Sequence, residues 1–563
     1  TRVTTQYEMH AVEAAGLLKM DFLGIRNLSI LGKAVEIVAK TTGEKIDIYD
    51  LPFDDRETFA MLSRGETMGT FQLAGSGMTR WLKELRPNRI EDIMAMVALY
   101  RPGPMESIPE YIRRKHNPEL VRYLDPRMKK YLDKSYGLIV YQDDLLFSAL
   151  ELAGYNWEEA DKFRKAVGKK IPEEMAAQKE KLTKGIVAHG QTKEFAEELW
   201  KLFEPFQAYG FNKAHAASYG IFAYQTAYMK AHYPVQYMTA VLQAEADDTD
   251  KVAEIVHECG RMGIEVLPPD VNESFRNFAM VSKPGENGRI RFGLTAIKNV
   301  GEHICEVVYA ERKERGPYQS LEDLLSRVQD KDLNKKSLES LIQAGALDSF
   351  GYDRGLLLAN TEQLLAFARA ARERLTSSQH SLFGGSNFEE EGKVVLRHDG
   401  QASLDDKLRW EKQLLGLYIS SHPFVAYERV LHRCLTPLID VQAKPRDSWV
   451  VVGGVVAGMK KKLTKKGAVM LFVTIEDMSG GMELLVFPKT YETTQAIWRE
   501  NAIVCVVGKT PKEEGDNKIF VENVYLLTPE NVEATARQLS LAAPASVAPI
   551  SVEEAGLHLE LTS

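Results

Sequence analysis

The chain has 563 residues, of which 44% are hydrophobic and 27% are charged, and its formal net charge is −8. These proportions are typical of globular domains, and the length predicts about three or four of them. The acidic balance excludes a protein that attracts nucleic acid through its overall charge, so such binding would need local basic patches. We find no apolar stretch of about 18 residues and no signal peptide, and expect a cytoplasmic protein without a membrane span.

The four cysteines, Cys259, Cys305, Cys434 and Cys505, lie far apart in the sequence. Without a CxxC pair they exclude a zinc ribbon, and their small number excludes a disulfide scaffold. The pattern favours a reducing compartment. Because the chain begins at Thr1 within a polar run and without a methionine, we expect it to be a fragment.

Near the start, the segment GLLKMD (16–21) alternates apolar and polar residues. A short strand here would present Lys19 and Asp21 on one face, and residues 22–40 then have the pattern of a helix. The alternative is that Asp21 only caps this helix. From 51 to 240 the pattern is almost wholly helical.

One helix within that region has clear boundary signals. Asn156 can cap it, Glu159 can complete a capping box, and Gly168 can end it. Its exposed cations include Arg164 and Lys165, which suit phosphate groups, although ordinary surface cations would look similar.

Residues 204–234 form an aromatic and glycine-rich turn followed by a helical pattern that stops at Pro234. Asn212, Lys213 and His215 lie at the helix start, where free N–H groups and the helix dipole favour an anion. A lysine and a histidine there could hold a phosphate and contact a sugar. The alternative is a core helix with a solvated lysine.

Two later segments suggest contacts with other molecules. Residues 291–312 have the layout of a helix-hairpin-helix, with Lys298, Asn299 and Gly301 in the hairpin, where N–H groups can face a DNA phosphate without reading bases. A plain helical hairpin is the alternative. The polar segment 372–401 contains Gln379, Leu382 and Phe383, which can dock in a partner's pocket, although such short patterns also arise by chance.

From residue 448 the hydrophobic period changes to two, with strands predicted at 449–458, 468–477, 481–487, 502–509 and 518–526. Three strands, a helical break and two more strands match an OB-fold. The first hairpin tip is basic and includes Lys460, Lys461 and Lys465, which would hold a single strand by charge. We therefore predict a multidomain α+β protein with a mostly helical first half, a helix-hairpin-helix module and an all-β OB-fold.

The motifs occur in an order that resembles one family, the α subunit of the bacterial replicative DNA polymerase III, or C-family polymerases. The segments that carry the resemblance are LLKMDFLGIRNLSI, FQLAGSGM, ALYRPGPM, YGLIVYQ, FRKAVGKK, YGFNKAHAASY, AYQTAYMKAHYP, MGIEVLPPDVN, RFGLTAIKNVGE and GLYISSHP. They cover nearly the whole chain up to the tail after Pro529, so coincidence is excluded.

The resemblance implies that Asp21 is the third palm carboxylate, which helps to hold two catalytic Mg²⁺ ions, with Lys19 facing the same site. The family's other two aspartates come from an upstream Asp-x-Asp strand. The aspartates at Asp248 and Asp330 lie in polar loops and do not match it. The PHP domain, the thumb and most of the palm are therefore expected to be missing from this chain.

The resemblance also assigns a nucleotide pocket. Arg164 and Lys165 would contact the dNTP triphosphate, His215 would press on the sugar and exclude a 2′-hydroxyl, and Tyr209, Asn212 and Lys213 would line the pocket. Departures from the family pattern are Lys165 in place of an arginine, Asp143-Asp144 where Glu-Gln is more usual, and Ala74-Gly75 in the glycine-rich turn.

Further implied partners are primer-template DNA, single-stranded template DNA, the sliding clamp at Gln379 to Phe383, and other subunits of the replicase holoenzyme. The expected domains are the end of the palm (1–26), fingers (27–270), helix-hairpin-helix module (271–372), clamp-binding region and linker (373–447), OB-fold (448–530) and tail (531–563). The main hypothesis is a portion of a template-directed DNA polymerase. The alternative is a non-catalytic DNA-binding and clamp-tethering protein derived from the same family.

Overall fold

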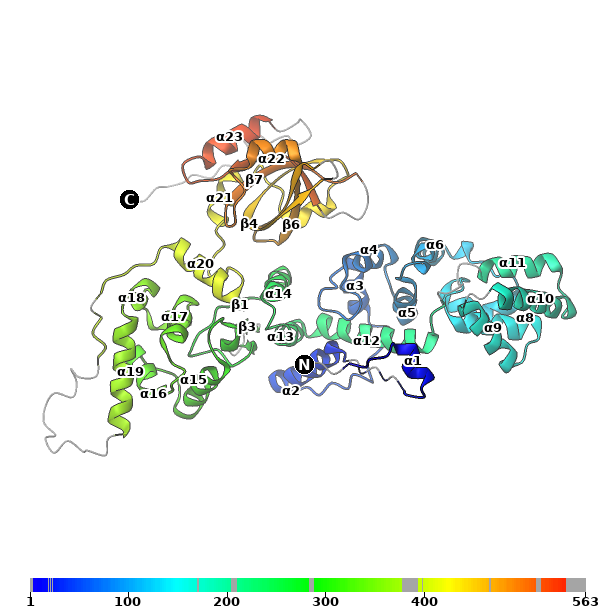
Figure 1. Cartoon of the computed structure of the whole chain (residues 1–563), viewed down its shortest axis with the longest axis horizontal. Helices are drawn as coiled ribbons and strands as arrows, with labels where there is room; N and C mark the ends of the chain where they lie inside the picture. Colours follow the sequence, from blue (N-terminus) through cyan, green and yellow to red (C-terminus); the bar gives the residue numbers. More distant parts are fainter. Residues whose placement is uncertain are drawn as a thin grey trace. The chain divides into compact units, whose positions relative to one another are not determined.

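The computed structural model describes residues 4–18, 20, 22, 24–169, 172–203, 210–282, 288–376, 393–396, 398–464, 467–512 and 518–542. The chain divides into two compact units, Thr1–Ala244 and Glu245–Ser563. The predicted class, mostly helical with a separate small β-barrel, is confirmed (Figure 1). Of the helices that the structure describes, none is long and apolar enough to cross a membrane. The finer division into six domains stays a prediction.

The described part of the first unit is built from helices. They are α1 Met9–Ala14, α2 Arg26–Thr42, α3 Arg56–Arg64, α4 Ser76–Leu85, α5 Ile90–Leu99, α6 Ile108–His116, α7 Lys129–Leu132, α8 Gln142–Ala153, α9 Trp157–Lys169, α10 Pro172–Ala188, α11 Lys193–Phe203, α12 Lys213–His232 and α13 Pro234–Ala244.

Helix α12 is the central element of this unit. It packs along α3 and α5 (Figure 1), and its middle is buried on every side, including Phe222, Tyr224 and Met229. A helix that is apolar around its whole circumference must lie inside a core. The predicted stop is confirmed, because α12 ends at His232 and Pro234 begins α13.

A second core lies among α7 to α11 and is centred on Phe163, Trp200 and Phe203. The predicted capping box of α9 is confirmed. The N–H of Glu159 donates to Asn156 Oδ1 at 2.9 Å, and the N–H of Asn156 donates to Glu159 Oε2 at 3.0 Å. The cap fixes where α9 begins, and so where its cations lie.

The strand predicted at 16–21 is wrong for the residues of it that the structure describes. Leu17, Leu18 and Met20 are in no strand and are 61%, 85% and 68% exposed. A strand needs a partner for its N–H and C=O groups, and this segment pairs with none among the described residues. Helix α2 also begins later than expected, at Arg26, with Phe22 91% exposed before it.

The second unit combines helices with two sheets. Its helices are α14 Thr249–Arg261, α15 Glu302–Arg315, α16 Leu321–Arg327, α17 Lys335–Gln343, α18 Arg354–Ala359, α19 Thr361–Thr376, α20 Leu404–Leu415, α21 Val425–Leu431, α22 Pro488–Thr494 and α23 Val532–Ala542. Its strands are β1 Val266–Leu267, β2 Ala279–Val281, β3 Arg289–Arg291, β4 Trp449–Leu463, β5 Val469–Glu476, β6 Gly481–Val486, β7 Ile503–Lys509 and β8 Lys518–Leu526.

The predicted hairpin lies between the 3-10 turn η6 (Leu294–Ala296) and α15, so its first helix is shorter than expected. Asn299 has a φ of 69°, which allows the tight turn. Val300 is buried and anchors the loop, whereas Lys298 and Gly301 on either side are exposed.

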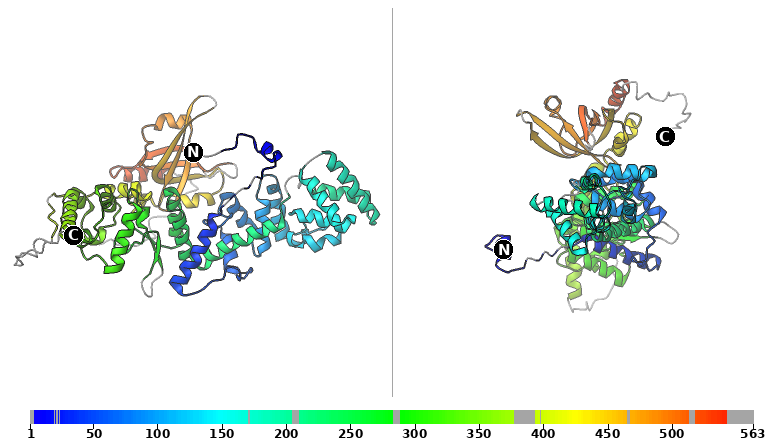
Figure 2. Two further views of the ribbon diagram at one scale, coloured as in Figure 1. Left: turned by 60° about the horizontal axis from the view of Figure 1, so that its bottom comes forward. Right: turned by 90° about the vertical axis from the view of Figure 1, so that its right-hand side faces the viewer.

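The five predicted strands of the OB-fold close into a barrel in the order β4-β5-β6-β8-β7 (Figure 2). Strand β4 pairs with both β5 and β7. Gly454 allows this closure, because a Cβ there would lie 2.5 Å from the carbonyl oxygen of Glu476. Helix α22 packs against β5 and β8, and α23, which the tail composition did not predict, packs against α21.

A buried charge holds part of the first unit together. Asp92 on α5 is fully buried and accepts hydrogen bonds from the hydroxyls of Tyr111 and Tyr136, both at 3.1 Å. It also pairs with Lys115 on α6, whose pKa is lowered by burial. The carboxylate therefore joins α5, α6 and the turn that contains Tyr136.

We expect Asp92→Ala to lower the free energy of unfolding by about 3–5 kcal/mol, because it leaves a buried ammonium without its partner. The measurement is urea unfolding followed by circular dichroism. The control is Asp54→Ala, at an exposed position, which should change stability by less than about 0.5 kcal/mol. Equal effects of the two variants would show that the Asp92 network does not stabilise the fold.

Candidate functional site

The start of α12 is held by two side-chain acceptors. Asn212 is its N-cap, and Asn212 Oδ1 accepts the N–H of His215 at 2.9 Å. The N–H of Lys213 donates to Asp143 Oδ2 at 3.1 Å. The sequence predicts an anion at this helix start, and in this structure the carboxylate of Asp143 supplies one.

His215 is exposed, and two aromatic contacts restrict the orientation of its imidazole. It stacks on Tyr219 with ring centroids 4.2 Å apart and an interplanar angle of 28°. It also lies edge-on to Phe211 at 5.1 Å. Two aromatic contacts restrict the ring more than a free surface histidine, and the ring can therefore present a flat apolar face to a ligand.

The side chain of Gln142 connects α9 to the turn before α12. Its Oε1 accepts a hydrogen bond from Arg164 Nη1 at 3.1 Å, and its Nε2 donates to the carbonyl of Gly210 at 2.8 Å. The N–H of Gln142 also donates to the carbonyl of Phe211 at 2.9 Å. The structure thus brings Arg164 next to the residues that lead into α12.

Arg164 and Lys165, the α9 cations of the predicted site, share one carboxylate. Arg164 donates to Asp161 Oδ1 at 3.1 and 2.8 Å, and Lys165 Nζ lies 2.7 Å from Asp161 Oδ2. These cations lower the pKa of Asp161. The two positive charges are therefore paired with a carboxylate at the surface of α9.

The hairpin before α15 contains the residues for which the sequence predicts nucleic-acid contacts. Lys298 and Asn299 are exposed at its tip, and Gly301 is the N-cap of α15, with no side-chain acceptor. The backbone is fixed, since the N–H of Lys298 donates to the carbonyl of Leu414 at 3.0 Å. The N-cap of α15 therefore supplies no side-chain acceptor to the first-turn N–H groups of the helix.

The barrel carries an aromatic and cationic surface, of which the sequence predicted only lysines. Phe472 on β5 points away from the barrel core, with Lys462 Nζ 5.8 Å and Lys518 Nζ 5.7 Å from its ring centroid. Cross-strand neighbours extend the row through Leu485 to Phe520. The prediction that Lys460 and Lys461 lie in the hairpin tip is wrong, because β4 runs on to Leu463 and includes both. Lys460 is the cross-strand neighbour of Phe472 and extends this row, whereas Lys461 pairs with Leu471 and its Nζ lies 5.9 Å from the ring centroid of Tyr491.

Several predicted site residues lie outside the described residues, so they stay predictions. These are Lys19, Asp21, Tyr209, Gln379, Leu382, Phe383 and Lys465. Among the residues that the structure does describe, one group could hold a metal ion, namely His303, Asp330 and Asp332, whose ligand atoms lie within 4.8 Å of one another. It belongs to the helix-hairpin-helix module, and it is not the expected Mg²⁺ site.

Three segments of the chain match known protein families. Residues 27–190 match the bacterial DNA polymerase III alpha subunit finger domain, residues 263–357 match a helix-hairpin-helix motif, and residues 450–527 match an OB-fold nucleic acid binding domain. The DNA polymerase III subunit alpha of Thermus aquaticus is 43% identical over 535 residues, which are 93% of this chain and 43% of that protein.

The DNA polymerase III subunit alpha of Saccharopolyspora erythraea is 37% identical over 97% of this chain and 47% of its own length. That of Pseudomonas aeruginosa is 37% identical over 91% of this chain and 46% of its own length. The chain belongs to the DNA polymerase III alpha subunit family. It spans less than half the length of these relatives.

Three residues that the sequence analysis did not assign to the site hold its predicted members in place. Gln142 joins Arg164 to Gly210, Asp143 accepts from the first N–H of α12, and Asp161 pairs with both site cations of α9. Asp143 gave a signal in the sequence, as a departure from the family's usual Glu-Gln. The Asp161 pairs have the i,i+3 and i,i+4 spacing of neighbours on one helix, so the sequence offered that signal too, whereas the Gln142 link depends on tertiary structure.

Asp144, the second member of that departure, is a buried acid beneath the site. It is 1% exposed, and its Oδ2 accepts the N–H groups of Val140 and Tyr141, both at 2.8 Å. Burial raises its pKa to about 7. The protonated form is therefore favoured in the folded state.

Because the pKa of Asp144 is raised in the folded state, this residue stabilises the fold fully below pH 4. That stabilisation is lost as the pH rises through about 7. We expect Asp144→Asn, which keeps an acceptor but cannot ionise, to match the parent chain at pH 4. At pH 8 its free energy of unfolding should be higher by about 1–3 kcal/mol.

The measurement is urea unfolding at intervals between pH 4 and pH 8. Asp50→Asn, at an exposed position, is the matched control and should show no such trend. A difference between Asp144→Asn and the parent that stays constant over this range would rule out a buried titrating acid.

Proposed function

We propose that the chain is the fingers-to-OB portion of a replicative DNA polymerase alpha subunit. The parent reaction adds a dNTP to a primer 3′ end by attack of the 3′ oxygen on the α-phosphate. The observation that carries the proposal is the link from Arg164 through Gln142 to Gly210, at 3.1 and 2.8 Å. It joins two motifs to which the family resemblance assigns one nucleotide pocket.

In this proposal the cations of α9 bind the triphosphate of the dNTP. Arg164 supplies a planar fork and Lys165 a point charge. Tyr209, Asn212 and Lys213 line the pocket, and the ring of His215 contacts the sugar where a 2′-hydroxyl would project. Binding exchanges the Asp161 and Asp143 carboxylates for phosphate oxygens, so the nucleotide enters a site whose cations are already oriented.

The metal chemistry needs more than this chain provides. Two Mg²⁺ ions would stabilise the charge on the attacking and leaving oxygens, and they require several carboxylates. Asp21 is proposed as one ligand, with Lys19 beside it. We therefore expect the isolated chain to bind nucleic acid without extending a primer.

The second unit would hold the nucleic acid and the replication partners. The hairpin at Lys298 to Gly301 suits the duplex product, and the Phe472 surface suits the single-stranded template. Gln379, Leu382 and Phe383 would bind the sliding clamp. Other subunits of the holoenzyme are further proposed partners, and the proposed compartment is the cytoplasm.

The nucleotide proposal is best tested in a complete alpha subunit whose corresponding region is replaced by this chain. We expect Arg164→Ala and Lys165→Ala each to raise KM for dNTPs about tenfold or more, because a charge-assisted contact worth about 1.5–3 kcal/mol is lost. His215→Ala should weaken the rejection of ribonucleotides. Steady-state primer extension measures both effects.

Lys184→Ala is the matched control, because Lys184 also pairs with a carboxylate four residues earlier, Glu180, at 2.6 Å. It should leave KM unchanged. Equal KM values for the parent, Arg164→Ala, Lys165→Ala and Lys184→Ala would show that Arg164 and Lys165 are not in the nucleotide site. That result would favour the alternative, a non-catalytic DNA-binding and clamp-tethering protein.

For the barrel, we expect Phe472→Ala to weaken binding of an oligo(dT) strand by about 1–3 kcal/mol, through loss of base stacking. Fluorescence anisotropy with a labelled strand gives the affinity. Trp449→Ala serves as control. The ring centroid of Trp449 also lies 4.6 Å from a lysine, Lys509 Nζ, but Trp449 is at the start of β4, whereas Lys462 beside Phe472 is near its end. A larger effect of Trp449→Ala would place the strand elsewhere on the barrel.

A further inference from the structure

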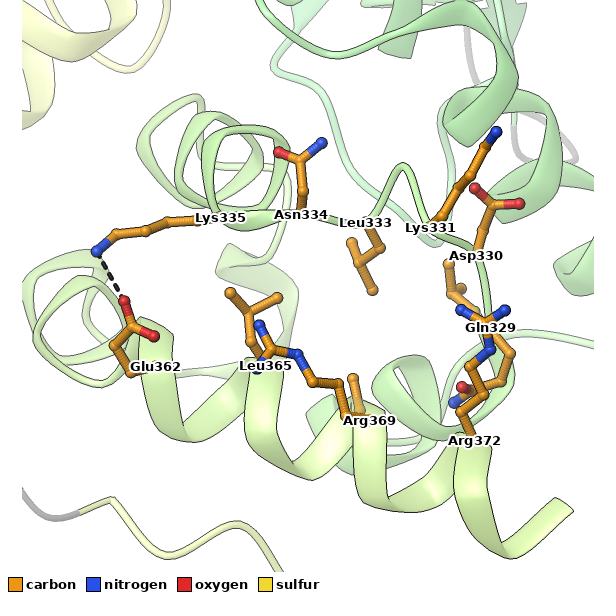
Figure 3. A pocket seen from close by; sticks show the side chains of 12 residues that line it. Gln329, Asp330, Lys331, Leu333, Asn334, Lys335, Glu362, Leu365, Arg369 and Arg372 are labelled. Atoms are coloured by element: carbon orange, nitrogen blue, oxygen red, sulfur yellow. Dashed lines mark hydrogen bonds and ion pairs between the residues drawn. The ribbon is translucent and has the colours of Figure 1, made fainter. Parts of the chain in front are cut away.

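A cavity of about 350 Å³ lies in the second unit between residues 328–335 and one face of α19 (Figure 3). Its apolar lining is formed by Val328, Leu333, Leu365 and Ala368, each at most 9% exposed. Figure 3 shows Leu333 and Leu365 pointing toward each other from the turn and from the helix. The charged residues of the lining are Asp330, Lys331, Lys335, Glu362, Arg369 and Arg372.

Cations outnumber carboxylates in this lining, and both carboxylates already have donors. Glu362 Oε1 lies 2.8 Å from Lys335 Nζ. Asp330 interacts with His303 Nε2 at 3.0 Å and accepts the N–H of Asp332 at 2.8 Å, and its pKa is lowered mainly by that backbone hydrogen bond. The net positive charge of the lining favours an anion.

The cavity lies at the same end of the module as the DNA-facing hairpin. Helix α16, the turn 328–334 and α17 repeat the layout of η6, the hairpin and α15. His303 is in the first turn of α15, and its contact with Asp330 joins the two turns directly. A strand that lies along the start of α15 can therefore reach the cavity.

We propose that this cavity is a second binding site for the duplex backbone, in which one phosphate lies among Lys331, Arg369 and Arg372 and its sugar contacts the apolar lining. Arginine forks bind phosphate oxygens in pairs, and Leu333 and Leu365 offer an apolar surface to a deoxyribose. Helix α19 lies beyond residues 263–357, which match the helix-hairpin-helix motif. The inference rests on the proposed duplex binding by this module.

The test uses the full chain and a labelled 20-base-pair duplex, with affinity measured by anisotropy at several salt concentrations. We expect Arg369→Ala and Lys331→Ala each to weaken binding about tenfold and to reduce the salt slope by about 1, the effect of one lost phosphate contact. Arg369→Lys should retain most of the affinity. Glu362→Gln, which removes a negative charge from the lining, should strengthen binding.

Arg315→Ala is the matched control. Arg315 is exposed in the same module but at the opposite end of α15, about 20 Å from its start. It should leave affinity and slope unchanged. Thermal unfolding curves that match the parent confirm that each variant is folded, and Arg369→Lys and Glu362→Gln keep the test decisive if Arg369→Ala is unstable.

The outcomes separate this inference from the proposal on which it rests. If the parent chain binds no duplex, both fail. If it binds, and Lys298→Ala weakens binding while the cavity variants and Glu362→Gln do not change it, the cavity is not a backbone site. The cavity variants could instead bind inorganic phosphate more weakly than the parent while their duplex affinity and its salt dependence stay unchanged. The cavity would then be a site for a free anion, and the inference would also be overturned.

Discussion

The arrangement of the fingers depends on one side-chain amide. An amide offers donors on one side and an acceptor on the other, and Gln142 uses both, donating to Gly210 and accepting from Arg164. A carboxylate at this position could not donate, and an asparagine would be shorter by one methylene. The next residue, Asp143, receives the first N–H of α12. Two consecutive residues thus fix the spacing between the α9 cations and the α12 start.

The same contacts explain how the site keeps its charges ordered without a ligand. Asp161 holds both site cations of α9, and Asp143 neutralises the start of α12. Nucleotide affinity would then be a difference between two sets of charge-assisted contacts, because each phosphate contact replaces a carboxylate contact. In the proposed nucleotide site, such exchange would favour correct orientation over maximal affinity and would help the site to release its product.

Local signals predicted much of the fold, and failed where tertiary structure decides. The capping box at Asn156, the stop before Pro234 and the period-2 strands of the barrel depend on neighbouring residues, and all are confirmed. The segment at Leu18 has the alternation of a strand, but it lacks a partner among the described residues. The links of Gln142 span 22 and 68 residues, and no periodicity encodes them. The site's residue types and the local Asp161 pairs were therefore predictable, whereas the link through Gln142 was not.

The second unit shows how a chain of net charge −8 can be suited to nucleic acid. Weak overall attraction leaves recognition to short-range groups, and these differ in chemistry from one surface to the next. The hairpin at Asn299 offers backbone N–H groups, the α19 cavity offers cations, and the Phe472 face offers a ring between lysines. Phosphate contacts weaken steeply with salt, whereas stacking depends on exposed bases and is available only to single strands. Phosphate contacts and base stacking together would therefore distinguish duplex product from unpaired template by their structure and not by their sequence.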